Sequence, residues 1–270
     1  MGTGEAQRVR LDIAGQVAQV TLAHEARMNA FDEAMHADLR AAIDMVKGNS
    51  SMRVLILTGL GRAFSAGQDL GERAAVFEGG SQPDLRASLD NNYNPLVLSL
   101  AELPIPVIAA VNGIAFGAGA GLAIACDMVL AAPNARFQFG FINVGLGLDS
   151  GVSWSLPRLV GQARAFDLAL TGRPVLAEEA LAMGLVSRIV AAADLSETAW
   201  TIAKDIAGKS PAAVAGIKRQ LRGNPLGTLA TALDAERDAQ ASLGRTAEYR
   251  DAVLHFASAR KQRHYEERNT

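Results

Sequence analysis

A single carboxylate lies in the stretch GLGLDSG, residues 145–151, where Asp149 is surrounded by small and apolar residues. Burial in an apolar pocket raises the pKa of a carboxyl group because it disfavours the charged form. Such a group is a better base and can return the proton that it takes. Asp149 also directly precedes Ser150, where a helix is expected to start, so its side chain can instead be a helix N-cap. The sequence alone leaves both roles open.

Two glycine-containing segments follow short apolar runs. FSAGQDL, residues 64–70, follows VLILTG, and NGIAFGAGAGLA, residues 112–123, follows VIAAV. Loops at the ends of strands can bring free backbone N–H groups together, and glycine and alanine let a ligand approach that backbone closely. The alternative is that both segments are merely tight turns.

Several familiar sites are incomplete in this chain. Neither GAGAGLA nor GLGLDSG completes the dinucleotide-binding pattern G-x-G-x-x-G, because Leu122 and Ser150 occupy the third glycine position. AFSAG, residues 63–67, is close to the G-x-S-x-G nucleophile motif, which needs a histidine late in the chain. His255 and His264 are the candidates, and they lie in a charged helical segment. We therefore expect neither nucleotide binding of this kind nor a serine nucleophile.

The histidines and the cysteine do not form a metal-binding pattern. The four histidines show no ligand spacing with carboxylates or with Cys126, so we expect no metal and interpret each histidine as a surface or boundary residue. Cys126 is the only cysteine and lies in an apolar run, which favours a buried structural thiol in a reducing compartment.

Composition favours a globular protein that acts on a small acyl substrate. The 270 residues are 49% hydrophobic and 20% charged, with a net charge of -2. The sequence contains no basic stripe, so we do not expect nucleic acid or acidic lipid as a partner. Residues 1–15 lack the apolar stretch of a signal peptide, so we expect a cytoplasmic protein. Residues 105–132 are apolar enough to suggest a membrane span, but Pro106, Asn112 and Asp127 divide them into shorter pieces. We expect no membrane association.

The elements that must position these residues alternate between strands and helices. The expected strands are residues 9–14 and 17–23 (a hairpin), 53–59, 107–111, the segment DMVLAA (127–132) and 184–190; the expected helices are 32–47 and 85–103. Residues 60–73 are predicted as a polar, glycine-rich loop, and residues 105–132 as strand, glycine turn, short buried helix and strand. This order indicates an α/β fold with mostly parallel strands.

From residue 194 onward the pattern changes to four helical stretches with no strand between them. We therefore expect a core over residues 1–193 and a helical region over residues 194–270. The apolar stripes of that region must be buried against the core or against another subunit.

The segments AFSAGQDL, PVIAAVNGIAFGAGAGLAIACDMVLAAPNARF and LPRLVGQARAFDLALTGRPVLAEEALAMGLVSRIV together resemble the enoyl-CoA hydratase/isomerase (crotonase) superfamily over nearly the whole chain. The resemblance implies a spiral of ββα units with a helical C-terminal region that builds trimers, often paired into hexamers. It also implies acyl-CoA thioesters as substrates, with no metal or redox cofactor. The backbone N–H groups of Gln68 and Ala118 match the family positions that bind the thioester oxygen, where two such donors stabilise an enolate-like oxyanion.

Family hydratases use two glutamates, and their positions here hold Gly121 and Phe141. Neither residue can move a proton, so water addition by the two-carboxylate route is not expected. Asp149 instead matches the aspartate of isomerases that act on dienoyl-CoA and ring-epoxide substrates, and of 4-chlorobenzoyl-CoA dehalogenases. The dehalogenase route also needs a histidine, and none lies between His36 and His255. Proton transfer by Asp149 is therefore favoured over covalent catalysis.

Within the family, the stretches AGQDL, YNPL, GAGAGLA, GLGLDSG and LPRLVGQARA most resemble the ring-1,2-epoxyphenylacetyl-CoA isomerases of phenylacetate degradation. Tyr93 is a candidate for the acyl pocket, although a core position is equally compatible with the sequence. The family's CoA contacts match Ala26, Met28, Ala66, Gln68, Asp69 and Leu70, with Phe256 and Lys261 in the last helix. Two alternatives remain open: a hydratase-like or hydrolase-like enzyme in which Asp149 alone holds a water, and an inactive relative that binds acyl-CoA or RNA.

Overall fold

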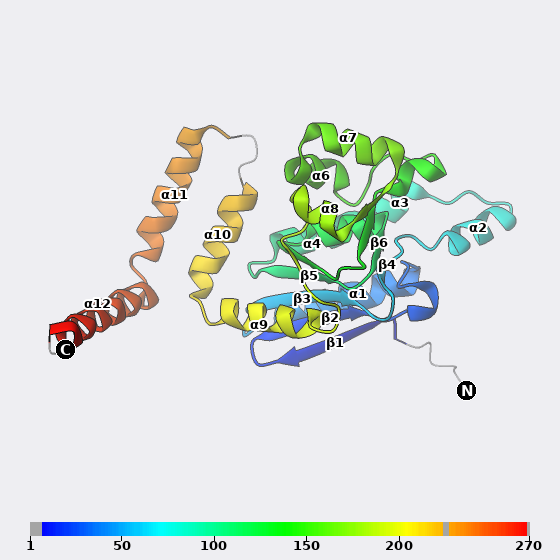
Figure 1. Cartoon of the computed structure of the whole chain (residues 1–270). Helices are drawn as coiled ribbons and strands as arrows, with labels where there is room; N and C mark the ends of the chain where they lie inside the picture. The colour runs from blue at the N-terminus through cyan, green and yellow to red at the C-terminus, as the bar shows by residue number, and fades with distance from the viewer. Residues whose placement is uncertain (1–6, 224–226, 269–270) are drawn as a thin grey trace. The chain divides into compact units, whose positions relative to one another are not determined.

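The computed structural model describes residues 7–223 and 227–268 and divides into two compact units, residues 1–208 and 209–270. All strands of the described chain belong to the first unit, as do the helices through α9 (Leu195–Ala207). The division thus lies one helix after the boundary expected between residues 193 and 194 (Figure 1).

The larger sheet has six strands in the order β1-β2-β3-β5-β7-β10. Its bounds are β1 (Val9–Ala14), β2 (Val17–Leu22), β3 (Val54–Gly59), β5 (Val107–Val111), β7 (Met128–Ala131) and β10 (Arg188–Ile189). The expected hairpin is confirmed, since β1 pairs antiparallel with β2, and the other neighbours pair in parallel as predicted. The strand expected over residues 184–190 is reduced to two residues at the edge of this sheet.

The smaller sheet has four short strands in the order β4-β6-β8-β9, with bounds β4 (Ala63–Ser65), β6 (Ile114–Phe116), β8 (Arg136–Gln138) and β9 (Pro174–Leu176). The first three run parallel and β9 is antiparallel. The prediction of residues 60–73 as a loop is wrong, because β4 and the start of α2 (Leu70–Glu78) lie there. A three-residue strand carries too little alternation to be detected, and its pairing depends on a partner far along the chain.

The two sheets are connected by a repeated unit of a longer strand, a short strand and a helix. β3, β4 and α2 form one repeat, and β5, β6 and α5 (Ala118–Ala125) form the next. β7 and β8 lead through the 3-10 helix η3 (Gly140–Val144) to α6 (Val152–Val160). The turns between strands pack tightly, because a Cβ added at Gly113 would overlap the backbone oxygen of Arg62. This is the expected spiral of ββα units, and it places the ends of β4, β6 and β8 side by side.

The helix α1 (Glu33–Gly48) begins as predicted, with the Asp32 carboxylate accepting a hydrogen bond from the Met35 N–H at 2.7 Å. The helix expected over residues 85–103 is instead three segments: α3 (Leu85–Ser88), the π-helical η2 (Leu89–Tyr93) and α4 (Asn94–Glu102). Pro95 lacks an N–H and its ring crowds the carbonyl four residues earlier, which is that of Asn91. Arg40 donates a hydrogen bond to this Asn91 carbonyl at 2.8 Å, so the carbonyl has a partner from outside the helix.

Two apolar cores hold the first unit together. One lies between the two sheets and includes the buried stripe of α1 and the helices α7 (Gln162–Thr171) and α8 (Ala177–Ala182). The other lies between the opposite face of the larger sheet and α9, through Leu195, Ala199 and Ala203. Trp200 adds a hydrogen bond from its ring N–H to Gln19 on β2 at 2.8 Å. Cys126 is buried, as expected for a structural thiol.

The second unit contains α10 (Pro211–Gly223), α11 (Leu229–Leu243) and α12 (Ala247–Arg268), so the four expected helical stretches are α9 to α12. It exposes several large apolar side chains, among them Leu221, Leu229 and Leu233. Within the described residues, no helix combines the length and the apolar character that crossing a bilayer requires.

Candidate active site

A cavity of about 340 Å³ lies where the loops after β4 and β6 meet the segment before α6. Of the predicted site residues, the structure brings seven together in its wall: Ala66, Gln68, Leu70, Tyr93, Ala118, Phe141 and Asp149. The remaining wall is mainly apolar, with Leu85, Leu89, Phe116, Val144, Leu146 and Leu148, and it also includes Arg73 and Ser88. Four predicted contacts, Ala26, Met28, Asp69 and Gly121, do not line this cavity.

The Gln68 and Ala118 amides come together because β4 and β6 are parallel neighbours. Gly67 has φ +76°, and a Cβ placed on it would lie 2.5 Å from the Phe116 oxygen and 3.2 Å from the Ala118 nitrogen. Only glycine allows this close approach of the two loops. Neither the Gln68 N–H nor the Ala118 N–H has a hydrogen-bond acceptor in the described part of the chain. Ala118 is also the first residue of α5, where a helix favours negative charge.

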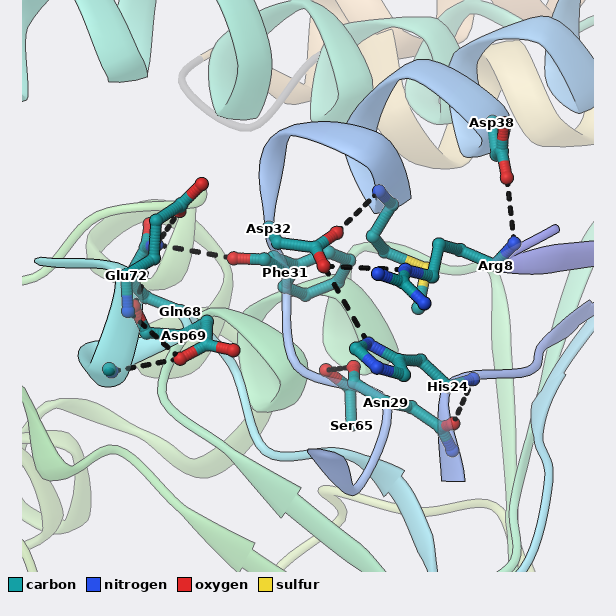
Figure 2. A network of polar contacts seen from close by, with 12 residues as sticks. Arg8, His24, Asn29, Phe31, Asp32, Asp38, Ser65, Gln68, Asp69 and Glu72 are labelled. Carbon is teal, nitrogen blue, oxygen red and sulfur yellow. Dashed lines mark hydrogen bonds and ion pairs between the residues drawn. The ribbon is translucent and has the colours of Figure 1, made fainter. Parts of the chain in front are cut away.

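The loop that carries Gln68 is held by hydrogen bonds to the segment before α1, and Figure 2 shows several of the residues involved. The Ser65 hydroxyl donates to the Asn29 backbone oxygen at 2.8 Å and accepts from the Gly67 N–H at 3.1 Å. Phe31 donates its N–H to the Gly67 oxygen at 2.7 Å and accepts from the Asp69 N–H at 3.0 Å. These bonds leave the intervening Gln68 N–H unpaired. They also give the Ser65 hydroxyl a structural role in this loop.

Asp69 has a structural role that the sequence analysis did not predict. Its carboxylate caps α2 by accepting from the N–H groups of Gly71 at 2.8 Å and Glu72 at 3.2 Å. It therefore holds the start of α2, which directly follows the loop that carries Gln68. The expectation that Asp69 contacts the substrate stays a prediction.

Asp149 lies in the segment between η3 and α6, and its carboxylate accepts a hydrogen bond from the Ser150 hydroxyl at 2.8 Å. It does not cap α6, since the N-cap is Gly151 and only the Asp149 backbone oxygen bonds to the helix, through Val152 N–H at 2.9 Å. Burial raises the pKa of the Asp149 carboxyl above its ordinary value, and the Ser150 hydrogen bond opposes this increase. The N-cap interpretation is therefore wrong, and the side chain is available to the cavity.

The two positions that hold glutamates in family hydratases cannot supply carboxylates here. Phe141 lines the cavity with a buried ring. Gly121 packs against the Asp149 segment, because a Cβ on it would lie 2.8 Å from the Ser150 Cβ and 3.1 Å from the Val152 Cγ2. The close packing explains why Gly121 lies outside the cavity. Asp149 is consequently the one carboxylate among the described residues that form the wall.

A polar cluster occupies one side of the otherwise apolar wall. The Gln68 side-chain oxygen accepts from the Tyr93 hydroxyl at 2.7 Å and from the Arg73 guanidinium at 3.0 Å. Arg73 also donates to the Ser88 hydroxyl at 2.5 Å. The sequence analysis missed Arg73 and Ser88. A signal for Arg73 existed, since it lies three residues after Leu70 and so shares its helix face, but that helix was not predicted.

Tyr93 lies in the cavity wall and not only in the core. Burial raises the pKa of its phenol well above the ordinary value, with the charge of Asp149 adding to the effect, so the hydroxyl stays protonated and donates. Behind it, His36 is 5% exposed and its ring centroid lies 4.5 Å from that of Tyr93. The interpretation of His36 as a surface or boundary residue is wrong: burial lowers the pKa of His36 to about 4, and the neutral ring packs like an aromatic residue.

Of the expected CoA contacts, Ala66, Gln68 and Leu70 line the cavity, whereas Ala26 and Met28 do not. Ala26 is exposed in the 3-10 helix η1 (Glu25–Arg27), and the Met28 backbone oxygen accepts from the Ala66 N–H at 2.9 Å. Met28 is thus held beside the loop that carries Gln68. Phe256 is exposed on α12 in the second unit, and the side chain of Lys261 lies outside the described residues. These contacts stay predictions.

Comparisons with known proteins all identify the same family. The family model described as Enoyl-CoA hydratase/isomerase matches residues 12–268. The chain is 43% identical over 244 residues to the 1,2-epoxyphenylacetyl-CoA isomerase of Escherichia coli (strain K12), covering 90% of this chain and 93% of that protein. It is 34% identical to the short-chain-enoyl-CoA hydratase of Clostridium acetobutylicum, covering 95% and 97%.

Solved structures agree with this result. The enoyl-CoA hydratase of Bacillus anthracis superimposes with a TM-score of 0.87 at 32% identity, covering 94% of this chain and 97% of that chain. The enoyl-CoA hydratase of Mycobacterium smegmatis gives a TM-score of 0.86 at 31% identity, covering 93% and 96%. The matches extend over nearly the full length of the chain, and the paired loops of the smaller sheet agree with them. The chain therefore belongs to the enoyl-CoA hydratase/isomerase family.

Proposed function

We propose that this protein is an acyl-CoA isomerase in which Asp149 moves a proton between carbons of a thioester-activated acyl group. The observation that carries the proposal is that one carboxylate, Asp149, shares a cavity with the two unpaired amides of Gln68 and Ala118. The 43% identity to a protein named as a 1,2-epoxyphenylacetyl-CoA isomerase supports the same class. A ring-epoxide substrate, opened to an oxepin, is the more specific form of this proposal.

The proposed reaction needs only groups that the cavity contains. The Asp149 carboxylate takes a proton from C2 of a 3-enoyl-CoA, and the electron pair moves to the thioester oxygen. The Gln68 and Ala118 N–H groups stabilise the enolate, each by about 3 kcal/mol. The carboxylic acid of Asp149 then gives its proton to C4 while the double bond forms between C2 and C3. One carboxylate is sufficient because the proton that leaves is the proton that returns, and no cofactor beyond the CoA of the substrate takes part.

A hydratase-like or hydrolase-like reaction is the second candidate, favoured by the identity to a short-chain-enoyl-CoA hydratase. In that case Asp149 alone would have to hold and activate a water, without the second carboxylate that Gly121 and Phe141 do not provide. An inactive protein that binds acyl-CoA is a third candidate. The relatives named in the comparisons do not separate these three.

One assay separates them. Incubation with crotonyl-CoA and a panel of 3-enoyl-CoA esters, followed through the enoyl thioester absorbance, reports both reactions. An isomerase leaves the crotonyl-CoA absorbance unchanged and raises that of the 3-enoyl esters as they become conjugated. A loss of the crotonyl-CoA absorbance supports hydration instead. If neither changes, and Asp149→Asn still binds acyl-CoA as the wild type does, the protein is a binder.

A further inference from the structure

Arg73 places a cationic side chain, which forms no ion pair with the described residues, in the wall of the apolar cavity. It lies in the first turn of α2, among the apolar residues that form most of this wall. A charged group in such surroundings needs hydrogen-bond partners, because burying it without them is costly. Its partners therefore indicate what the cavity is built to hold.

The bonds of Arg73 use only part of its donor capacity. One terminal nitrogen, Nη2, donates to the Gln68 side-chain oxygen at 3.0 Å and to the Ser88 hydroxyl at 2.5 Å. Nε is buried and has no acceptor. In the described part of the chain Arg73 forms no ion pair. Since a guanidinium carries five N–H donors, most of those on Arg73 are not used by the protein.

The charges around the cluster indicate which acceptor fits these donors. Near the Tyr93 hydroxyl, the negative charges of Asp149, Glu72 and Glu33 act together with the single positive charge of Arg73. Glu72 accepts a weak hydrogen bond from the Gln68 amide at 3.3 Å and remains close without pairing to the arginine. A further carboxylate on the acyl group would add to this negative excess. An uncharged oxygen accepts the hydrogen bond without that repulsion.

We propose that Arg73 determines specificity by donating a hydrogen bond to an uncharged oxygen, such as a ketone, ether or epoxide oxygen, carried by the acyl group away from its thioester carbon. The inference rests on the proposed function for the placement of the acyl group in the cavity. Tyr93 and Ser88 complete the polar side of the wall, and the leucines on the other sides accept the hydrocarbon portion.

The test measures binding, so that it does not depend on turnover. The probes are two saturated acyl-CoA esters of equal length, one with a keto group in the middle of the acyl chain and one with a methylene there. Wild-type protein should bind the keto ester more tightly, by about tenfold, as expected for one hydrogen bond to a charged donor. Arg73→Met should reduce that ratio to about one. Arg73→Lys, which keeps the charge, should retain part of it.

Two controls exclude other roles of Arg73. Arg86→Met removes an exposed arginine on α3 outside the cavity wall and should leave the ratio at its wild-type value. If Arg73 only positions Gln68, or if it contacts the CoA portion, Arg73→Met weakens both esters equally and the proposal is wrong. Tighter binding of an ester that ends in a carboxylate would also overturn it. If the wild-type protein does not isomerise 3-enoyl-CoA esters, the proposed function is wrong. The ratio of the two binding constants still decides this inference.

Discussion

Asp149, the proposed acid and base, carries a charge that is unfavourable where it lies. Because burial raises its pKa in the folded protein, its ionisation is less favourable there than in the unfolded chain. The ionised carboxylate therefore lowers the free energy of unfolding at every pH above its native pKa. This is the pattern expected for a group whose environment is arranged for proton transfer rather than for stability.

The first prediction follows because the ionised Asp149 carboxylate lowers the free energy of unfolding. Asp149→Asn keeps the shape and the acceptor for the Ser150 hydroxyl but removes the charge, so the variant should unfold at a higher temperature than the wild type at neutral pH. Differential scanning calorimetry measures this. Asp12→Asn, at an exposed position on β1, is the matched control and should change little. A less stable Asp149→Asn protein would show that the carboxylate is paired favourably in the fold.

The second prediction concerns the pH dependence of turnover. Asp149 must be ionised to accept a proton, so kcat/KM should rise with pH through its pKa, at a higher pH than for an ordinary aspartate near ~3.9. The Ser150 hydrogen bond lowers that pKa. Ser150→Ala should therefore move the rise to a higher pH. If the rise of kcat/KM stays at the same pH or moves to a lower pH, the Ser150 hydrogen bond does not lower the pKa of Asp149.

At the scale of elements, the cavity depends on where short strands and helix starts meet. β4 and β6 together supply six residues, yet their parallel pairing determines that the Gln68 and Ala118 amides lie in one place. On the other side, α5 packs against the segment that carries Asp149 through Gly121, which has no room for a side chain. This contact leaves no room for a glutamate at position 121, where family hydratases carry one. It also brings the segment of Asp149 close to α5.

The third prediction tests that contact. Gly121→Ala places a Cβ within 2.8 Å of the Ser150 Cβ, so the segment of Asp149 must move. We expect a loss of about 1–3 kcal/mol in the free energy of unfolding, typical of overpacking, together with a lower kcat. Gly48→Ala, at the end of α1 with open space around it, is the control and should cost little. Full activity in Gly121→Ala would show that the contact does not position Asp149.

Much of the site could be predicted from local sequence, and the rest could not. Asp149, Gln68 and Ala118 lie in recognisable stretches, and the hairpin and the first long helix follow clear periodic patterns. Arg73 and Ser88 enter the wall only because α2 and α3 meet Tyr93 there, which no local pattern predicts. The burial of His36 depends in the same way on its stacking against Phe31 and its edge-to-face contact with Tyr93.

At the scale of the whole molecule, the second unit exposes apolar side chains that a soluble surface rarely carries together. Leu221 is 82% exposed and Leu229 is 75% exposed, and α12 adds Phe256 at 65%. Large apolar side chains exposed to this degree favour burial against a partner surface. The resemblance to the family implies that other copies of the chain provide it.

The fourth prediction is therefore an oligomeric state. Sedimentation velocity or light scattering of the full chain should give the mass of a trimer or of a dimer of trimers. Leu229→Glu, which places a charge on the exposed apolar stripe of α11, should shift the protein toward smaller species while the first unit keeps its fold by circular dichroism. A monomer at micromolar concentration in the wild type would contradict the prediction.

The most direct test of the central claim follows the proton itself. A 3-enoyl-CoA that carries two deuterium atoms at C2 is converted in ordinary water, and mass spectrometry locates the label in the 2-enoyl product. We predict that the wild type places part of the label on C4, because Asp149 returns what it takes, and that Asp149→Asn loses turnover by about 10²–10⁴-fold. A folded Asp149→Asn protein that transfers the label as fast as the wild type would contradict the account.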